Sequence, residues 1–275
     1  MPWRRIVLWI ASLELVLLYA PTLAWLFERW TLSVWHHAHG LFIPPLVGYF
    51  AYQELRQRTA LPTGASVWGL AIVAPALALR AVDAGMHTEL LSAVSLVLLL
   101  PGLSLLLLGT ERTKAILFPL AFLAFALPIP LAFTGQIHWQ LRLIATGATA
   151  AVLPWLDIPV FVEGTTLDLP RGTLQVADAC SGFSALYAAV ALACLVAYST
   201  ESTGRRVLVL LSAAPLAIVA NVFRVVLLVT LVQWQGQGIL DTMVHPATGV
   251  LTFALALPVI FWLGTDPPRT EAASP

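Results

Sequence analysis

The sequence has few charged residues. Only 10% of its 275 residues are charged, 14 basic and 14 acidic, whereas 59% are hydrophobic. Because soluble domains carry about a quarter of charged residues, this composition excludes an ordinary soluble protein. The formal net charge of zero gives no indication of a nucleic acid or another highly charged partner.

Cysteine is equally scarce, since Cys180 and Cys194 are the only two. On one helix their separation would span about 21 Å, whereas a disulfide needs Cα atoms within about 7 Å. The chain is therefore not a disulfide scaffold. It also lacks the HExxH spacing of zinc proteases, and its one histidine-rich stretch, HHAH at 36–39, has a different pattern. We expect neither a metal nor an organic cofactor.

Long apolar runs, by contrast, are abundant. Several approach the roughly 20 residues that a helix needs to cross a bilayer, and they lack the short alternating pattern of barrel strands. The sequence predicts an all-α polytopic membrane protein, with about eight transmembrane helices in a single membrane domain over residues 1–264. These spans are expected near residues 5–27, 40–55, 64–80, 88–109, 115–133, 180–199, 207–231 and 246–263.

Basic residues between the apolar runs indicate the orientation. With the N-terminus in the cytoplasm, every basic cluster falls on the cytoplasmic side, which is the positive-inside pattern. Both termini are then cytoplasmic. Residues 134–156 would break this pattern by crossing the membrane, so we expect them to form an interfacial helix at the outer leaflet. The clusters are Arg4 with Arg5, Arg56 with Arg58, Arg112 with Lys114, Arg205 with Arg206, and Arg269.

Two segments have patterns that are not helical. Residues 158–177 alternate apolar with polar side chains around the sequence PRG, which predicts an extracytoplasmic β-hairpin. This hairpin leads directly to Cys180. Residues 265–275 are polar and rich in proline, which predicts a disordered cytoplasmic tail.

Polar residues from three predicted spans reach about the same depth. Cys180 opens a span that enters from outside, and His245 opens another. Arg224 lies 18 residues after Arg206 in a span that starts inside, on the same helical face as Asn221. Arginine within a span usually marks a functional site. Taken singly, the arginine could snorkel to the interface, the histidine could be interfacial and the cysteine could be a packing residue.

Together these side chains suit cysteine acyl transfer. A helix N-terminus and a nearby cation favour the reactive thiolate of Cys180. His245 can exchange a proton near neutral pH, and the guanidinium of Arg224 can stabilise an oxyanion. Ser181 and Gly182 would let a substrate backbone approach closely. Asp178 either caps the helix or pairs with the arginine.

Three stretches, ACSGFSALY, ANVFRVV and VHPATG, resemble in order and spacing the exosortase/archaeosortase family. The likeness extends to HAHGLFIPPLVGYFAY at 37–52, to FPLAFLAFALPIPLAF at 118–133 and to GTTLDLPRGTLQVADACSG, the segment that leads to the cysteine. The resemblance covers nearly the whole chain up to the polar tail. It implies a multi-pass cysteine transpeptidase or protease of the bacterial inner membrane, whose site faces the periplasm or exterior.

The resemblance also implies roles for individual residues. Cys180 would be the nucleophile, Arg224 would stabilise charge, His245 would be the acid/base and Asn221 would support them. His39 lies in the HG pair of the family, and its role is left open.

The substrate implied by the resemblance is an exported membrane-anchored protein with a C-terminal sorting tail. Such a tail has a motif such as Pro-Glu-Pro (PEP-CTERM type), a transmembrane helix and basic residues. Its acidic residue could meet Arg171, Arg142 or Arg224. The acceptor could be an amine, a hydroxyl of a glycan or lipid, or water.

Three other readings stay open at this point. A transporter or channel would line a path through the bilayer with polar residues, whereas here they cluster on one side. A non-catalytic receptor for sorting tails would not need the thiol of Cys180. A rhomboid-like serine protease would use Ser181 or Ser184, but the chain lacks a GxSx pattern on a helix in the middle of the membrane.

Overall fold

The computed structural model describes residues 2–31, 38–177 and 180–265. The chain divides into two compact units, Met1–Ile129 and Pro130–Pro275. The part of the tail beyond residue 265, which we predict to be disordered, lies outside the described residues.

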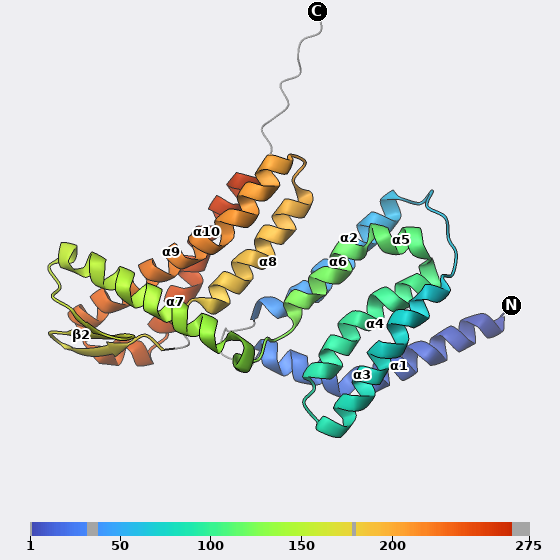
Figure 1. The fold of residues 1–275 in the computed structure, drawn as a ribbon, viewed down its shortest axis with the longest axis horizontal. Coiled ribbons are helices and arrows are strands. Elements are labelled where there is room, and N and C mark those ends of the chain that lie inside the picture. Colours follow the sequence, from blue (N-terminus) through green and yellow to red (C-terminus); the bar gives the residue numbers. More distant parts are fainter. Residues whose placement is uncertain (1, 32–37, 178–179, 266–275) are drawn as a thin grey trace, which may run out of the picture. The chain divides into compact units, whose positions relative to one another are not determined.

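The first unit is helical (Figure 1). The helix α4 (Leu90–Leu108) lies beside η2 (Val67–Gly69) and α3 (Leu70–Met86). These segments approach closely at two glycines, Gly69 at the end of η2 and Gly102 in α4. A Cβ atom added to Gly69 would lie 2.5 Å from the carbonyl oxygen of Gly102, so small residues let these backbones approach, as in many membrane helix pairs. The elements are α1 (Pro2–Thr31), η1 (Ala38–Leu41), α2 (Ile43–Gln57), η2 (Val67–Gly69), α3 (Leu70–Met86), α4 (Leu90–Leu108), α5 (Thr110–Ala115), α6 (Leu117–Phe122) and η3 (Leu123–Ala126).

A buried carboxylate joins α3 to α4. Both oxygens of Asp83 accept hydrogen bonds, from the backbone N–H groups of Thr88 at 3.3 Å and Ser92 at 3.0 Å and from the hydroxyls of the same two residues. Acceptors at the start of a helix satisfy N–H groups that lack intrahelical partners. This acidic residue therefore has a structural role at the α3–α4 turn.

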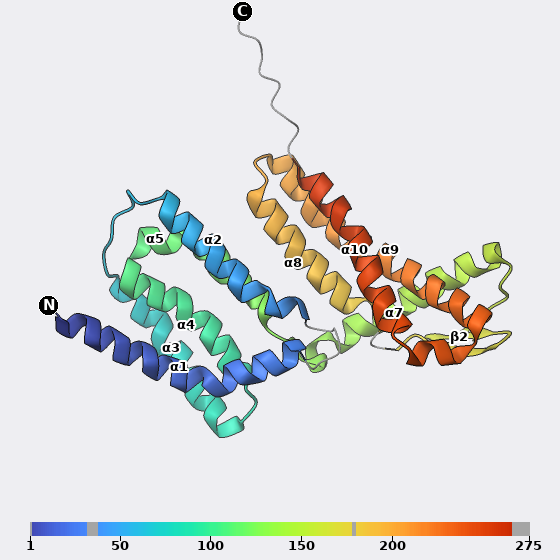
Figure 2. The same ribbon diagram turned by 180° about the vertical axis from the view of Figure 1, so that it is seen from behind.

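The second unit contains a helical bundle and a small sheet (Figures 1 and 2). Three helices run alongside one another (Figures 1 and 2): α8 (Phe183–Ser199), α9 (Thr203–Gln235) and α10 (Val244–Gly264). The helix α7 (Leu131–Val152) runs across them (Figure 1). The elements are α7 (Leu131–Val152), η4 (Leu153–Leu156), β1 (Phe161–Glu163), β2 (Thr166–Leu169), β3 (Gly172–Gln175), α8 (Phe183–Ser199), α9 (Thr203–Gln235), η6 (Gln237–Asp241) and α10 (Val244–Gly264).

The long helix α9 passes through two hydrophobic cores. Its first half packs with α8 and α10 through Val209, Ala213 and Ala217. Its second half packs with α7, the sheet and η6 through Val225, Val229 and Val232. The side chain that separates the two cores on this buried stripe is Asn221, which is polar.

The sheet differs from the predicted hairpin. Three short antiparallel strands form a meander in the order β1-β2-β3. The turn at PRG joins β2 to β3, where Leu169 pairs with Gly172. A further turn at Gly164, whose φ is +61°, joins β1 to β2. The prediction of a two-stranded hairpin over 158–177 missed this turn. The turn depends on the left-handed conformation of Gly164, which an alternating pattern of apolar and polar residues does not predict.

The helices support a mostly helical polytopic membrane protein, whereas the predicted number of eight spans is not confirmed. Among the described residues, five helices are long and apolar enough to cross a membrane: Trp9–Thr31, Val67–Met86, Leu90–Leu108, Thr203–Gln235 and Ala247–Gly264. Two apolar helices are shorter, Leu117–Ala126 and Phe183–Ser199. The first of these ends before Pro128 and Pro130, and the second begins only after Gly182.

The segment 134–156 is helical, as α7 and η4. It starts at Leu131, directly after Pro130, and runs across α8–α10 (Figure 1). Its position at the membrane interface and the extent of the membrane domain, 1–264, stay predictions.

Candidate active site

Cys180 lies in a tight turn before α8. Its N–H donates to the carbonyl oxygen of Ala177 at 2.9 Å. Gly182 precedes the helix with φ +82° and ψ 4°, a left-handed conformation that glycine adopts readily. The thiol-bearing residue thus sits close to a helix N-terminus, where the helix dipole favours negative charge.

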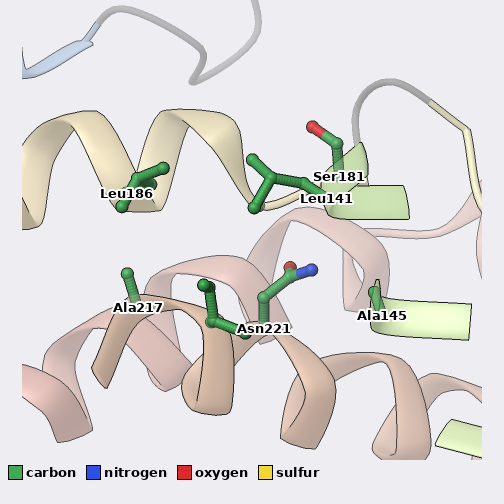
Figure 3. A pocket seen from close by; sticks show the side chains of 8 residues that line it. Leu141, Ala145, Ser181, Leu186, Ala217 and Asn221 are labelled. Carbon is green, nitrogen blue, oxygen red and sulfur yellow. The ribbon is translucent and has the colours of Figure 1, made fainter. Parts of the chain in front are cut away.

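Asn221 holds this turn from α9. Its side-chain amide donates to the carbonyl oxygen of Cys180 at 3.1 Å, and only 5% of Asn221 is exposed. A Cβ atom on Gly182 would lie 2.5 Å from Cγ of Asn221. Figure 3 shows Asn221 pointing from α9 toward the segment that carries Ser181. The glycine is therefore required both by its conformation and by the space that the asparagine occupies.

The hydroxyl of Ser181 makes hydrogen bonds with α7 and with the first residue of α8. It lies 2.8 Å from Nδ1 of His138 in α7 and accepts the N–H of Phe183 at 3.3 Å. The rings of His138 and Phe183 have centroids 4.6 Å apart. Only 2% of Ser181 is exposed, which limits the access of a substrate to its hydroxyl.

Arg224 lies between the cysteine turn and α10. A Cβ atom on Gly249 would lie 3.1 Å from Cζ of Arg224 and 3.3 and 3.4 Å from its two terminal nitrogens, so the guanidinium rests on the backbone of α10. Burial raises the pKa of the Cys180 thiol, and the positive charge of Arg224 opposes this rise. The arginine is thus close enough to favour the thiolate.

Two of the predicted site residues lie wholly or partly outside the described part of the chain. Asp178 lies outside it altogether. His245 is in the first turn of α10, but its side chain is not among those described. Its backbone position is one turn before Gly249, hence on the same stripe of the helix. The structure brings together Cys180, Arg224 and the supporting residues Asn221, Ser181 and Gly182.

A pocket lies beside the turn at the junction of α7, α8 and α9 (Figure 3). Its cavity volume is about 10 Å³, enough for about one water molecule. The polar end is formed by Ser181, Gly182 and Asn221, and the walls are apolar. The apolar residues are Leu141, Ala145, Leu186, Ala217 and Ile218.

The two arginines predicted to bind substrate have other contacts. Arg171 donates to the carbonyl oxygens of Gln233 and Trp234, so it ties the sheet to the C-terminus of α9, where a cation is favoured. Arg142 lies with Cζ 5.2 Å from the ring centre of Trp139. Their predicted binding of an acidic residue stays a prediction.

The HG pair lies in the first unit and has a packing explanation. A Cβ atom on Gly40 would lie 2.3 Å from Nε1 of Trp30, which donates to the carbonyl oxygen of Ala126 at 2.9 Å. The glycine makes room for this indole. His39 contributes its backbone carbonyl, which accepts the N–H of Phe42 at 3.1 Å. The part of HHAH before residue 38 lies outside the described residues.

Sequence reasoning missed two residues of this site. Gly249 is the last residue of the stretch VHPATG, in which a role was predicted only for His245. His138 shares a helical stripe with Leu141 and Ala145, two residues that line the pocket, and this spacing was visible in the sequence. Within the described part of the chain, His, Cys, Asp and Glu form no group of three that could hold a metal ion.

A family model described as transmembrane exosortase (Exosortase_EpsH) matches residues 25–262. The chain belongs to the transmembrane exosortase family. The match runs from α1 to near the end of α10, so it spans both units of this exosortase and includes every residue of the candidate site. Neither among curated proteins nor among solved structures is there a match.

Proposed function

We propose that this exosortase is a cysteine transpeptidase or protease that removes the C-terminal sorting tail of exported, membrane-anchored proteins. The observation that carries the proposal is the convergence of two α9 side chains on one turn. Asn221 binds the carbonyl oxygen of Cys180, and the charge of Arg224 acts on its thiol. A cysteine that only packs against its neighbours needs neither this hydrogen bond nor this charge.

The position along α9 supports a site near the outer surface of the bacterial inner membrane. From Arg206 to Arg224 the helix rises about 27 Å at 1.5 Å per residue. The hydrocarbon core of a bilayer is about 30 Å thick. With basic residues 205 and 206 in the cytoplasm, Arg224 and the cysteine turn lie near the opposite edge of the core. A peptide bond just outside a substrate's transmembrane helix can reach this depth.

The proposed reaction has two steps. The Cys180 thiolate attacks the scissile carbonyl, and the positive charge of Arg224 stabilises the oxyanion that forms. The C–N bond then breaks as the protonated His245 gives its proton to the leaving amine. A thioester remains on Cys180. An amine, a hydroxyl of a glycan or lipid, or water then attacks the thioester, gives its proton to His245 and releases the thiolate. These steps need no cofactor.

The experiment that tests this function uses the two cysteines of the chain as a matched pair. The exosortase is co-expressed with an exported protein bearing a PEP-CTERM tail, and loss of the tail is followed by gel mobility. We expect cleavage with Cys194→Ala and none with Cys180→Ala. Cleavage that persists in Cys180→Ala would remove this thiol from the chemistry. Unchanged co-purification of the intact substrate with both variants, without cleavage by wild type, would favour a sorting-tail receptor.

A further inference from the structure

The turn that carries Cys180 is held by α7 as well as by α9. His138 projects from α7 to the hydroxyl of Ser181, the residue directly after the cysteine, with Nδ1 and Oγ 2.8 Å apart. His138, Leu141 and Ala145 fall on one stripe of the helix, and the latter two line the pocket at this turn. The histidine is thus a polar member of the α7 face that meets the site.

The chemistry of the hydroxyl assigns a direction to this hydrogen bond. Ser181 Oγ already accepts the N–H of Phe183, and only 2% of Ser181 is exposed. A buried hydroxyl has one proton, which needs an acceptor. The nitrogen 2.8 Å away can accept it when the imidazole is neutral with its proton on Nε2. A chain then runs from the Phe183 N–H through Ser181 to His138.

We infer that His138 is a positioning residue of the cysteine site, which acts through Ser181 to keep the Cys180 thiol beside Arg224. This inference rests on the proposed function for its purpose, since a reactive thiol must stay near its cation. Nδ1 constrains the turn from α7 while the Asn221 amide constrains it from α9. With either constraint removed, the turn can relax and the thiol can leave the field of the guanidinium.

A purely structural role for His138 would depend on its ring, because the ring packs against Phe183 with centroids 4.6 Å apart. Two substitutions separate the explanations. His138→Phe keeps an aromatic ring and removes the nitrogen. His138→Asn removes the ring and keeps an acceptor near the position of Nδ1. Ser181→Ala removes the other end of the same hydrogen bond, and Gln136→Ala, at an exposed position on the same helix, is the control.

The measurement is the pH dependence of Cys180 alkylation by a water-soluble maleimide, in the full chain carrying Cys194→Ser. Alkylation follows the thiolate fraction, and it needs no protein substrate. We expect His138→Phe and Ser181→Ala to shift the profile to higher pH and to slow alkylation near neutral pH by about tenfold. The double variant should show no further shift, because both changes break one interaction. His138→Asn should recover most of the wild-type rate.

Two results would overturn the inference. One is an alkylation profile unchanged in both His138→Phe and Ser181→Ala, in protein whose thermal unfolding in detergent matches wild type. The other is a defect in His138→Asn as large as that in His138→Phe, which would assign the role to the ring. Because alkylation is independent of tail cleavage, failure of the proposed function in the co-expression assay leaves this test intact.

Discussion

The side-chain amide of Asn221 donates a 3.1 Å hydrogen bond to the backbone carbonyl oxygen of Cys180. The two residues are 41 positions apart in the sequence and lie on different helical segments, α9 and the turn before α8. Asn221 interrupts an otherwise apolar buried stripe of α9. A buried polar group in such a place is stabilising only when its partner is in position, so the bond specifies where the cysteine turn docks.

Replacing Asn221 with alanine should therefore affect both stability and reactivity. The carbonyl oxygen of Cys180 loses this donor, and the loss of such a hydrogen bond costs about 1–3 kcal/mol where the group is buried. We expect a lower unfolding temperature in detergent and a tail-cleavage rate reduced at least tenfold. Gln235→Ala, at an exposed position at the end of the same helix, should change neither. Wild-type cleavage by Asn221→Ala would show that the turn does not need this bond.

Gly182 and Gly147 offer a comparison between a required and a replaceable glycine. Alanine at Gly182 is strained by the φ of +82°, and its Cβ atom would lie 2.5 Å from the Asn221 side chain. We expect loss of cleavage and slower alkylation of Cys180. Gly147 lies within α7 with no atom within 4 Å of an added Cβ, so Gly147→Ala should stabilise the helix by about 0.5–1 kcal/mol. Equal effects of the two variants would contradict the docking of the turn by Asn221.

Arg224 sets the expected pH dependence of the thiol. Burial raises the pKa of Cys180 and the guanidinium opposes this rise, so Arg224→Gln should move the pKa higher still. The alkylation profile of Cys180 in a Cys194→Ser background should shift to higher pH. Because the pKa of Cys180 is raised in the folded protein, folding favours the neutral thiol. The neutral thiol therefore contributes to stability below the ordinary thiol pKa, and this contribution is lost as the pH rises through the raised pKa of the folded protein.

Gly249→Ala should also shift the alkylation profile of Cys180 to higher pH, but by less than Arg224→Gln. The added Cβ atom would lie 3.1 Å from Cζ of Arg224, so the guanidinium must move. Gly238→Ala is the matched control, since nothing lies within 4 Å of an added Cβ at Gly238. A profile that does not move in Arg224→Gln would mean that the arginine has no electrostatic influence on the thiol.

The HG pair should prove to be a packing element of the first unit. Gly40→Ala places Cβ 2.3 Å from the Trp30 indole nitrogen, so the indole must leave its bond to the Ala126 carbonyl. We expect a loss of about 1–3 kcal/mol, which is typical of overpacking, as a lower unfolding temperature in detergent. Gly48→Ala in α2, with nothing within 4 Å of its added Cβ, is the control. Cys180 alkylation unaltered by Gly40→Ala in protein that remains folded would separate this pair from the cysteine site.

Helical regions were the most predictable feature of the fold. The predicted span 88–109 is the helix Leu90–Leu108, so its limits are close to those expected. An apolar run of this length predicts a membrane helix without information about the rest of the fold. The count of spans was less secure. The predicted span 115–133 contains the helix break before Pro128. The first residues of the predicted span 180–199 form the turn at Gly182 and are not part of the helix. The extra turn at Gly164 changed a hairpin into a meander for a similar reason, since a single glycine can redirect a chain without altering the pattern around it.

The sequence by itself determined that this chain is a helical membrane protein, that it resembles the exosortases, and that Cys180, Asn221 and Arg224 are its unusual polar residues. These features are local, because composition, hydrophobic length and motif order can be read along the chain. Only the tertiary structure decided which residues meet. The Asn221 bond to the cysteine turn, the seat of Arg224 on Gly249 and the approach of His138 to Ser181 each join segments far apart in the sequence. Such contacts depend on how helices pack against one another, which a helical period constrains to a face but not to a partner.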